Sequence, residues 1–166
     1  LNEERGTVTL EKRIDAARKM ANHGAVVGFH FHPMVHYDRW REDYAAVFQL
    51  LMDNFDPAEV AMLSLGTLTF IKPVMREIRK RGIQTQILKM PLIEADGKLS
   101  YPDEIKQEMF RHAYQSFNQE WQQQVFFYLC MENQRHWEPV FGYQYPSNDE
   151  FEQAMKKSYM DKILAI

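Results

Sequence analysis

Three histidines, His30, His32 and His36, lie close together in the sequence and are suited to binding or catalysis. Because side chains at positions i and i+2 of a strand project from one face, His30 and His32 can reach the same ligand or metal ion. His36 is then a candidate third ligand, with Asp38 or Glu132 as a carboxylate partner. Such a set suits a metal-dependent hydrolase, in which the ion activates water. In the simpler alternative, the imidazoles line a polar mouth and hydrogen-bond to neighbours or to a ligand.

Cys130 is the only cysteine of the chain and comes directly before Met131 and Glu132. A cysteine at the end of a strand can act as a nucleophile or as a hydrogen donor, although a lone cysteine is more often a small buried apolar residue. A single cysteine also excludes an internal disulfide and a structural zinc site of four cysteines. Residues 64–67, Ser-Leu-Gly-Thr, either hold a polar ligand through backbone N–H groups or form a plain turn after a strand.

Basic residues gather in the middle of the chain, at Lys72, Arg76, Arg79, Lys80, Arg81 and Lys89. A run of charges on a helix is usually a solvated face. It is nevertheless the one place in this sequence that suits a phosphate backbone, and Lys98 and Tyr101 can extend the surface. The candidates for nucleic-acid contact are therefore Arg79, Arg81, Lys98 and Tyr101.

Hydrophobic periodicity and capping residues predict the elements that must position these side chains. Helices are expected at residues 10–22, 38–54, 72–81, 102–122, 134–141 and from 148 towards the C-terminus. Strands are expected at residues 25–31, 60–65, 84–88 and 125–130. Asp38 is the expected cap of the second helix, and Pro33 ends the first strand because proline donates no hydrogen bond to a ladder. A turn at residues 96–97 predicts a small hairpin.

Helices that alternate with short, wholly apolar strands predict an α/β fold with a parallel sheet covered on both faces. In such folds the chemistry gathers at the carboxyl ends of the strands. These ends are residues 30–36, 64–67, 89–91 and 130–132. The histidines, the serine turn and the cysteine are therefore expected at one mouth.

The composition is that of one globular domain, with 166 residues of which 45% are apolar and 26% are charged. The net charge of −3 argues against a free-standing, non-specific nucleic-acid binder, which needs excess positive charge. The apolar runs are far shorter than the roughly 20 residues that a membrane span requires. With one cysteine and no recognisable targeting segment, the chain is expected in a reducing, cytoplasmic setting.

Several ordered segments together resemble the spore photoproduct lyase family of radical S-adenosylmethionine proteins, often named DNA repair photolyases. The segments are Lys-Arg-Ile-Asp-Ala-Ala at 12–17, Val-Gly-Phe-His-Phe-His-Pro-Met at 27–34, Trp-x-x-Asp-Tyr at 40–44, Ser-Leu-Gly-Thr-Leu at 64–68 and Tyr-Leu-Cys-Met-Glu at 128–132. The resemblance covers residues 7–142. It is more specific than any single motif because the segments keep their order with suitable gaps.

The resemblance implies the C-terminal part of a partial (β/α)6 TIM-like barrel with parallel strands and outer helices. Residues 1–142 are expected to form its last β/α units, and residues 143–166 a helical extension packed on the same domain. Proteins of the family hold a four-iron, four-sulfur cluster through a Cys-x3-Cys-x2-Cys motif. The cluster reductively cleaves S-adenosylmethionine to a 5′-deoxyadenosyl radical, which in the family's namesake reaction reverses a thymine cross-link in DNA.

The chain departs from this pattern because Cys130 is its only cysteine, so the cluster ligands are absent. We therefore expect either a fragment that is inactive alone and pairs with the missing N-terminal half of the barrel, or a degenerate member without radical chemistry. An exposed sheet edge also allows self-association, as in a non-catalytic interaction domain.

The resemblance assigns five residues to the S-adenosylmethionine pocket, namely His30, Phe31, His32, Ser64 and Gly66. Cys130 is the catalytic candidate at the same mouth. The segment 97–101 stands where the family has a DNA-contacting hairpin, which makes DNA the expected partner of the whole protein.

Overall fold

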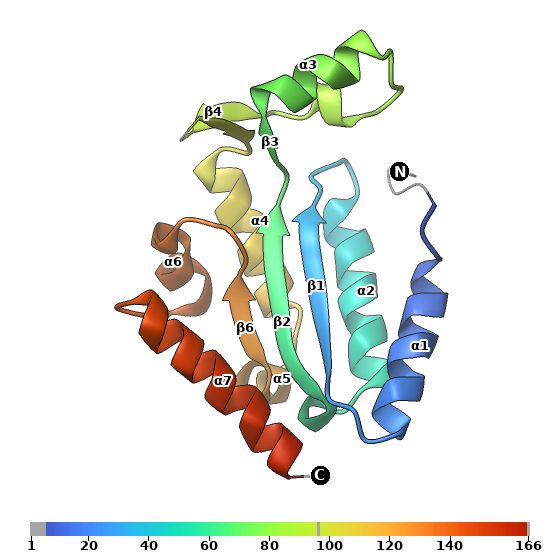
Figure 1. Ribbon diagram of the computed structural model, residues 1–166, viewed down its shortest axis with the longest axis vertical. Helices are drawn as coiled ribbons and strands as arrows, with labels where there is room; N and C mark the ends of the chain where they lie inside the picture. Colours follow the sequence, from blue (N-terminus) through green and yellow to red (C-terminus); the bar gives the residue numbers. More distant parts are fainter. Residues whose placement is uncertain (1–5, 96, 166) are drawn as a thin grey trace.

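A parallel sheet of three strands forms the centre of the protein (Figure 1), in a computed structural model that describes residues 6–95 and 97–165. The strands are β1 (Val27–Met34), β2 (Val60–Thr67) and β6 (Phe126–Leu129), hydrogen-bonded in the order β1-β2-β6. The protein is therefore a mixed α/β protein with a parallel sheet, as the alternation of helical and apolar segments predicts.

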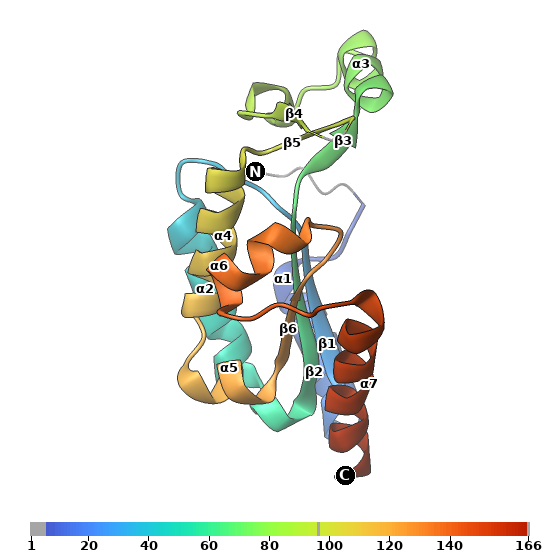
Figure 2. The ribbon, with the colours of Figure 1, turned by 90° about the vertical axis from the view of Figure 1, so that its left-hand side faces the viewer.

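The helices lie on both faces of this sheet (Figure 2). They are α1 (Leu10–Asn22), α2 (Trp40–Asn54), α4 (Asp103–Gln115), α5 (Gln119–Gln124), α6 (Trp137–Phe141) and α7 (Asn148–Leu164). Helices α2 and α4 cover one face, which we call the outer face, and α6 packs against α4. Helix α1 contacts α2 and β1. Helix α7 lies across the opposite face, the inner face, where it contacts β2 and β6.

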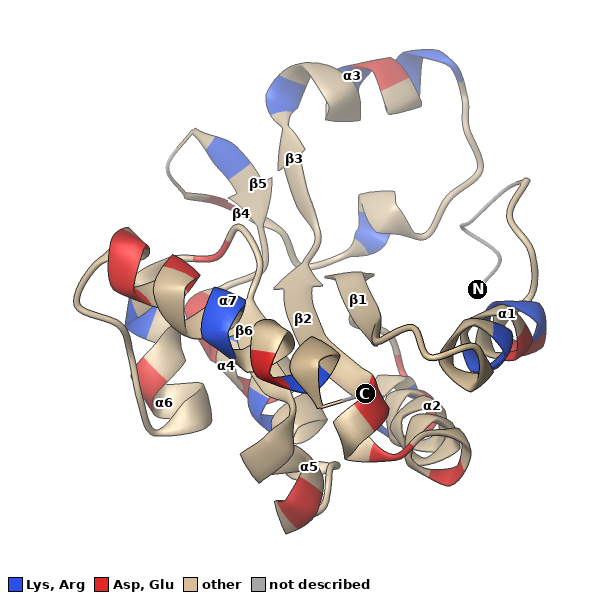
Figure 3. Ribbon diagram, turned by 60° about the horizontal axis from the view of Figure 1, so that its bottom comes forward, with Lys and Arg blue, Asp and Glu red and all other residues tan. Residues whose placement is uncertain are grey.

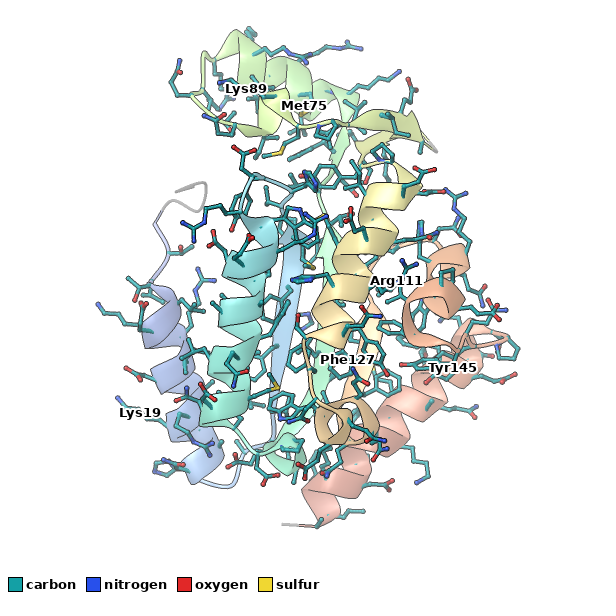
Figure 4. All side chains as sticks on the ribbon, turned by 180° about the vertical axis from the view of Figure 1, so that it is seen from behind. Lys19, Met75, Lys89, Arg111, Phe127 and Tyr145 are labelled. Atoms are coloured by element: carbon teal, nitrogen blue, oxygen red, sulfur yellow. The ribbon has the colours of Figure 1, made fainter. Side chains whose placement is uncertain are left out.

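The hydrophobic core lies between the outer face and helices α2 and α4. Leu63 and Leu65 of β2 are fully buried, as is Phe127 of β6. The Phe127 ring meets the rings of Tyr114 and Phe117 edge-on, with centroids 5.1 Å apart in both contacts. Figure 4 shows Phe127 enclosed within this layer. The buried contact of large apolar side chains is the main favourable term in the stability of such a fold.

A smaller unit stands above the parallel sheet, between β2 and α4 (Figure 1). It consists of β3 (Thr69–Ile71), α3 (Lys72–Lys80), β4 (Ile93–Ala95) and β5 (Lys98–Ser100). Its strands form an antiparallel sheet in the order β3-β5-β4. An ion pair of 2.7 Å between Lys72 Nζ and Glu94 Oε2 ties α3 to β4.

Several predicted elements form, and capping residues mark their ends. The Thr9 side chain accepts a hydrogen bond from Lys12 N at the start of α1, and the Ser147 side chain accepts one from Glu150 N at the start of α7. Gly142 ends α6 with a φ of 77°, a left-handed conformation that favours glycine. The predicted hairpin forms from β4 and β5, although Asp96 of its turn lies outside the described residues.

Two predicted elements are wrong. Residues 84–88 form no strand, because the chain there makes a single 3-10 turn, Ile87–Lys89, that sets Ile87 against the core. Within the described residues, the parallel sheet therefore has three strands instead of four, and residues 89–91 do not lie at a strand end. The helix expected over residues 102–122 is interrupted, because the Asn118 side chain caps a new helix by accepting a hydrogen bond from Trp121 N.

The junction of β1 and α2 also differs from expectation. Strand β1 continues past Pro33 to Met34, with a shift in register after Phe31. Proline is tolerated there because β1 is an edge strand, where one side of the backbone needs no ladder partner. Asp38 does not cap α2, whose N-cap is Arg39 without a side-chain hydrogen bond. Two further 3-10 turns span Pro57–Glu59 and Gln134–His136.

No helix within residues 6–95 and 97–165 is long and apolar enough to cross a membrane.

Candidate functional site

Polar side chains lie in rows across the inner face. Alternation along each strand sends every second residue to this face, and the register aligns His30 with Ser64 and Ser64 with Tyr128. One residue pair further along, His32 of β1 lies against Gly66 of β2. The inner face thus carries polar groups near the carboxyl ends of parallel strands, which is where α/β folds bind ligands.

The middle row is His30, Ser64 and Tyr128, one residue from each strand. Ser64 Oγ lies 2.5 Å from His30 Nδ1, and Ser64 also hydrogen-bonds the Tyr128 hydroxyl. Burial raises the pKa of Tyr128, while the hydrogen bond from Ser64 lowers it by a smaller amount. Because Ser64 is fully buried and His30 is exposed, the row connects a buried hydroxyl to an imidazole that a ligand can reach.

The upper row is His32, Gly66 and Cys130. A Cβ atom at Gly66 would lie 2.8 Å from His32 Cγ and 3.0 Å from the carbonyl oxygen of Cys130. Only glycine leaves room for this close approach of an imidazole and a backbone. Cys130 N donates a 2.7 Å hydrogen bond to Leu65 O, which holds the cysteine beside the end of β2.

A buried ion pair braces the same end of the sheet. Lys106 Nζ lies 2.8 Å from Glu132 Oε2, and the two side chains are 12% and 3% exposed. Glu132 Oε1 accepts hydrogen bonds from both the backbone N–H and the hydroxyl of Thr67, at 3.0 and 2.7 Å. The carboxylate therefore ties the loop after β6 to the end of β2 and to α4. Its partners satisfy the charge, so Glu132 acts as a brace and not as a free base.

A cavity of about 380 Å³ opens beside the end of β6. Tyr128, Cys130 and Glu132 contribute to its lining from the sheet side. Tyr145 and Phe151 line it from α7 and the segment before that helix. Figure 4 shows Tyr145 at this side of the molecule, away from the core around Phe127.

The proposed metal ligands do not come together. His30 and His32 share the inner face, as the i, i+2 spacing predicts, but the ring of His36 lies 5.7 Å from that of Trp40 and 6.1 Å from that of Tyr101. Among the described residues, no group of three or more His, Cys, Asp or Glu side chains is arranged to hold a metal ion. The described residues therefore do not support the hypothesis of a metal-dependent hydrolase.

Two other predicted site residues lie elsewhere. The Phe31 ring points to the outer face, where it meets Phe48 with a centroid separation of 4.9 Å, so only its backbone borders the inner face. Tyr101 is 1% exposed and its hydroxyl accepts a 3.0 Å hydrogen bond from His36 N. Burial raises the pKa of Tyr101 to about 12. This tyrosine supports the loop after β1 and does not form part of a nucleic-acid surface.

The basic candidates lie on the small upper unit (Figure 3). Arg79 and Arg81 are exposed at the end of α3, and Lys98 is exposed on β5. Arg81 Nε lies 2.7 Å from Glu77 Oε1, so part of its charge is already paired. These side chains are separate from the rows of the inner face.

Sequence reasoning missed Tyr128, Lys106, Tyr145 and Phe151. Strand alternation from Cys130 places Tyr128 on the same face, so this residue carried a usable signal. The other three come from separate helices or loops. Their approach to the end of β6 depends on tertiary packing that no local pattern encodes.

The sequence profile of the spore photoproduct lyase family matches residues 2–130. The spore photoproduct lyase of Geobacillus sp. (strain Y412MC61) is 31% identical over 86 residues, which are 51% of this chain and 25% of the relative. That of Bacillus subtilis (strain 168) is 36% identical over 89 residues, which are 52% of this chain and 26% of the relative. The chain thus matches about a quarter of the length of these relatives.

Solved structures of spore photoproduct lyase share the fold. A double mutant with bound AdoMet and dinucleoside spore photoproduct superimposes with a TM-score of 0.59 and 25% identity, over 75% of this chain and 39% of that one. The structural match and the sequence match thus point to the same family.

Proposed function

Because the chain belongs to the spore photoproduct lyase family, we propose that it is the C-terminal part of a radical S-adenosylmethionine DNA repair enzyme. The main support for this proposal is the inner face. Its polar rows lie near the carboxyl ends of parallel strands, within the residues that match the family. A solved relative with bound AdoMet and dinucleoside spore photoproduct supports a nucleoside cofactor and a DNA lesion as substrate.

The inner-face residues fit a nucleoside cofactor. His30 and His32 offer hydrogen-bonding groups for hydroxyls and ring edges. Ser64 holds the His30 ring in place, and Gly66 leaves the room that the His32 ring needs. Phe31 contributes its backbone alone. AdoMet bound here would supply a carbon-centred radical after reductive cleavage, and these residues would bind and orient the cofactor. Cys130, in the upper row, is the side chain of this chain best placed to react with a substrate.

A four-iron, four-sulfur cluster does not fit this chain, because such clusters are held by several thiolates and Cys130 is the only cysteine. We infer that the cluster belongs to a segment carrying the N-terminal half of a partial (β/α)6 barrel, and that this chain alone is inactive in the radical reaction. Strands β1 and β6 are the outer strands of the parallel sheet, which supports pairing with further strands. Residues 1–142 then form β/α units, and residues 143–166 form an extension.

The small upper unit is the proposed DNA contact. Arg79, Arg81 and Lys98 are exposed there and supply positive charge for phosphates. We expect Arg79→Ala with Lys98→Ala to weaken duplex DNA binding in fluorescence anisotropy and to reduce its salt dependence. The control Lys19→Ala lies on α1, far from this unit in Figure 4, and is expected to leave both unchanged. An equal effect of the control would contradict this surface.

Calorimetric titration of the intact chain with AdoMet tests the cofactor site. We expect saturable binding that His30→Ala with His32→Ala removes, because both imidazoles face the site. The matched control is His23→Ala, an exposed histidine at the C-cap of α1. Binding that persists in the double variant, or that His23→Ala removes equally, would contradict the assignment.

A further inference from the structure

Helix α7 lies outside the residues that match the family, yet it touches the inner face. The Phe151 ring lies 6.0 Å from that of Phe126 and 5.7 Å from that of Tyr128, measured between centroids. The Tyr145 ring, in the segment before α7, lies 6.2 Å from Phe126 and 5.7 Å from Phe151. The extension therefore packs on side chains that belong to the proposed cofactor and substrate face.

Polar contacts fix this extension at both ends. Near its C-terminus, Lys162 Nζ donates hydrogen bonds to Pro57 O, at 2.6 Å, and to Val60 O. Before its N-terminus, the Gln134 side chain donates to Tyr145 O. No described side chain of α7 is fully buried, so the helix lies on the surface of the sheet as a wall and does not form part of the core.

The wall closes one side of the cavity beside β6. Trp137, Tyr145 and Phe151 present aromatic rings to a space of about 380 Å³ that also reaches Cys130. Glu132 is the single charged residue among the described residues that line it, and Lys106 neutralises it. Such a space favours small, flat, uncharged groups. On the other side, Gly28, His30 and His32 of β1 are exposed, so α7 leaves that half of the face open.

We propose that Tyr145 and Phe151 are specificity-determining residues, which set the size of the group that reaches Cys130. They admit small, flat, uncharged groups and exclude bulky ones. This inference rests on the proposed function for its biological meaning, since it concerns access to the same face. Its geometry rests on the cavity and the ring contacts alone.

Thiol reagents of different size test the wall, because Cys130 is the only cysteine and mass spectrometry reports its modification directly. The probes are iodoacetamide, which is small, and N-(1-pyrenyl)maleimide, which is bulky, and both are uncharged. Each rate is divided by the rate for the same chain unfolded in urea. We expect the folded chain to slow the bulky reagent much more than the small one. Phe151→Ala and Tyr145→Ala should each reduce this size selectivity severalfold.

Gln153→Ala, an exposed position on α7, is the matched control and should keep the selectivity of the unaltered chain. A helix that merely supports the fold would, when loosened, speed both reagents alike, and that result would overturn the proposal. If Phe151→Ala does not unfold cooperatively, Phe151→Leu replaces it and should reduce the selectivity in the same direction. If the variants keep the selectivity of the unaltered chain and the unaltered chain binds AdoMet, the wall alone is rejected. If the variants lose selectivity and the unaltered chain does not bind AdoMet, the cofactor assignment alone is rejected.

Discussion

The two faces of the parallel sheet differ in what their side chains do. On the outer face, Leu63, Leu65 and Phe127 are buried against helices and make only apolar contacts with them. On the inner face, His30 is exposed and Ser64 is buried but hydrogen-bonded. Strands that alternate in this way separate stability from chemistry, because one face supplies burial while the other presents groups that a ligand can reach.

The two faces also differ in the kind of contact that stabilises them. Polar groups buried without partners are costly, so the inner face keeps its buried members paired. Ser64 pairs with His30, and Glu132 pairs with Lys106 and Thr67. The inner face is therefore held by a few specific contacts, whereas the outer face is held by many nonspecific ones.

Phe127→Ala gives the largest expected effect and tests the outer face. Loss of a buried aromatic ring leaves a cavity and costs about 3–5 kcal/mol of the free energy of unfolding. His30→Ala on the inner face removes one exposed partner of Ser64 and should cost about 1 kcal/mol. Urea unfolding followed by circular dichroism measures both. Equal losses would contradict the division between the two faces.

Lys106→Met tests the brace at the end of the sheet. It leaves the Glu132 carboxylate buried without its counter-charge, and we expect a loss of about 3 kcal/mol in urea unfolding. The double variant with Glu132→Gln should recover part of this loss, because the amide still pairs with Thr67 and carries no charge. A double variant no more stable than Lys106→Met would show that the charge is not the cause.

Gly66→Ala tests the close approach in the upper row. The added Cβ would lie 2.8 Å from a His32 ring atom, and the imidazole can turn away while the carbonyl of Cys130, at 3.0 Å, is fixed in the backbone. We expect a loss of about 1–3 kcal/mol and a shifted NMR signal of the His32 ring. Gly28→Ala is the matched inner-face control, because its tightest contact would be the flexible Met62 side chain, at 3.3 Å, and the nearest backbone atom, Met62 O, would lie at an ordinary 3.6 Å. A larger loss for the control would contradict the crowding argument.

The sequence predicted the outer face better than the inner one, for a physical reason. Short, wholly apolar runs identified β1, β2 and β6, because such a run between turn residues is a local pattern. The shared face of His30 and His32 followed from the alternation of side chains along a strand. The contacts of His36 with Tyr101, and of Phe151 with Tyr128, join residues far apart in the chain. Such contacts depend on how helices pack. The sequence therefore left a three-histidine metal site open as an alternative, which the described residues do not form, and α7 was given no role in the site.

Lys162 gives the smallest expected effect and tests how firmly α7 lies on the inner face. Burial lowers the pKa of Lys162 from 10.5 to about 8, against a smaller opposing effect of Asp56. Between these pH values the unfolded chain binds more protons than the folded chain, so the free energy of unfolding should rise as the pH increases from about 8 towards about 10. Because this side chain is only half-buried, solvent screening limits the gain to about 1 kcal/mol.

The rise should end near pH 10, where tyrosines ionise in the unfolded chain. The pKa of Tyr101 is raised to about 12 by burial, so the folded chain keeps this proton and loses relative stability above about pH 10. Lys162→Met should abolish the rise and leave the alkaline fall unchanged, whereas Lys156→Met, at an exposed position of α7, should keep both. Urea unfolding across this pH range measures the profile. If the rise in stability persists in Lys162→Met, another group causes it. The pH dependence would then not report on the contact between α7 and the start of β2.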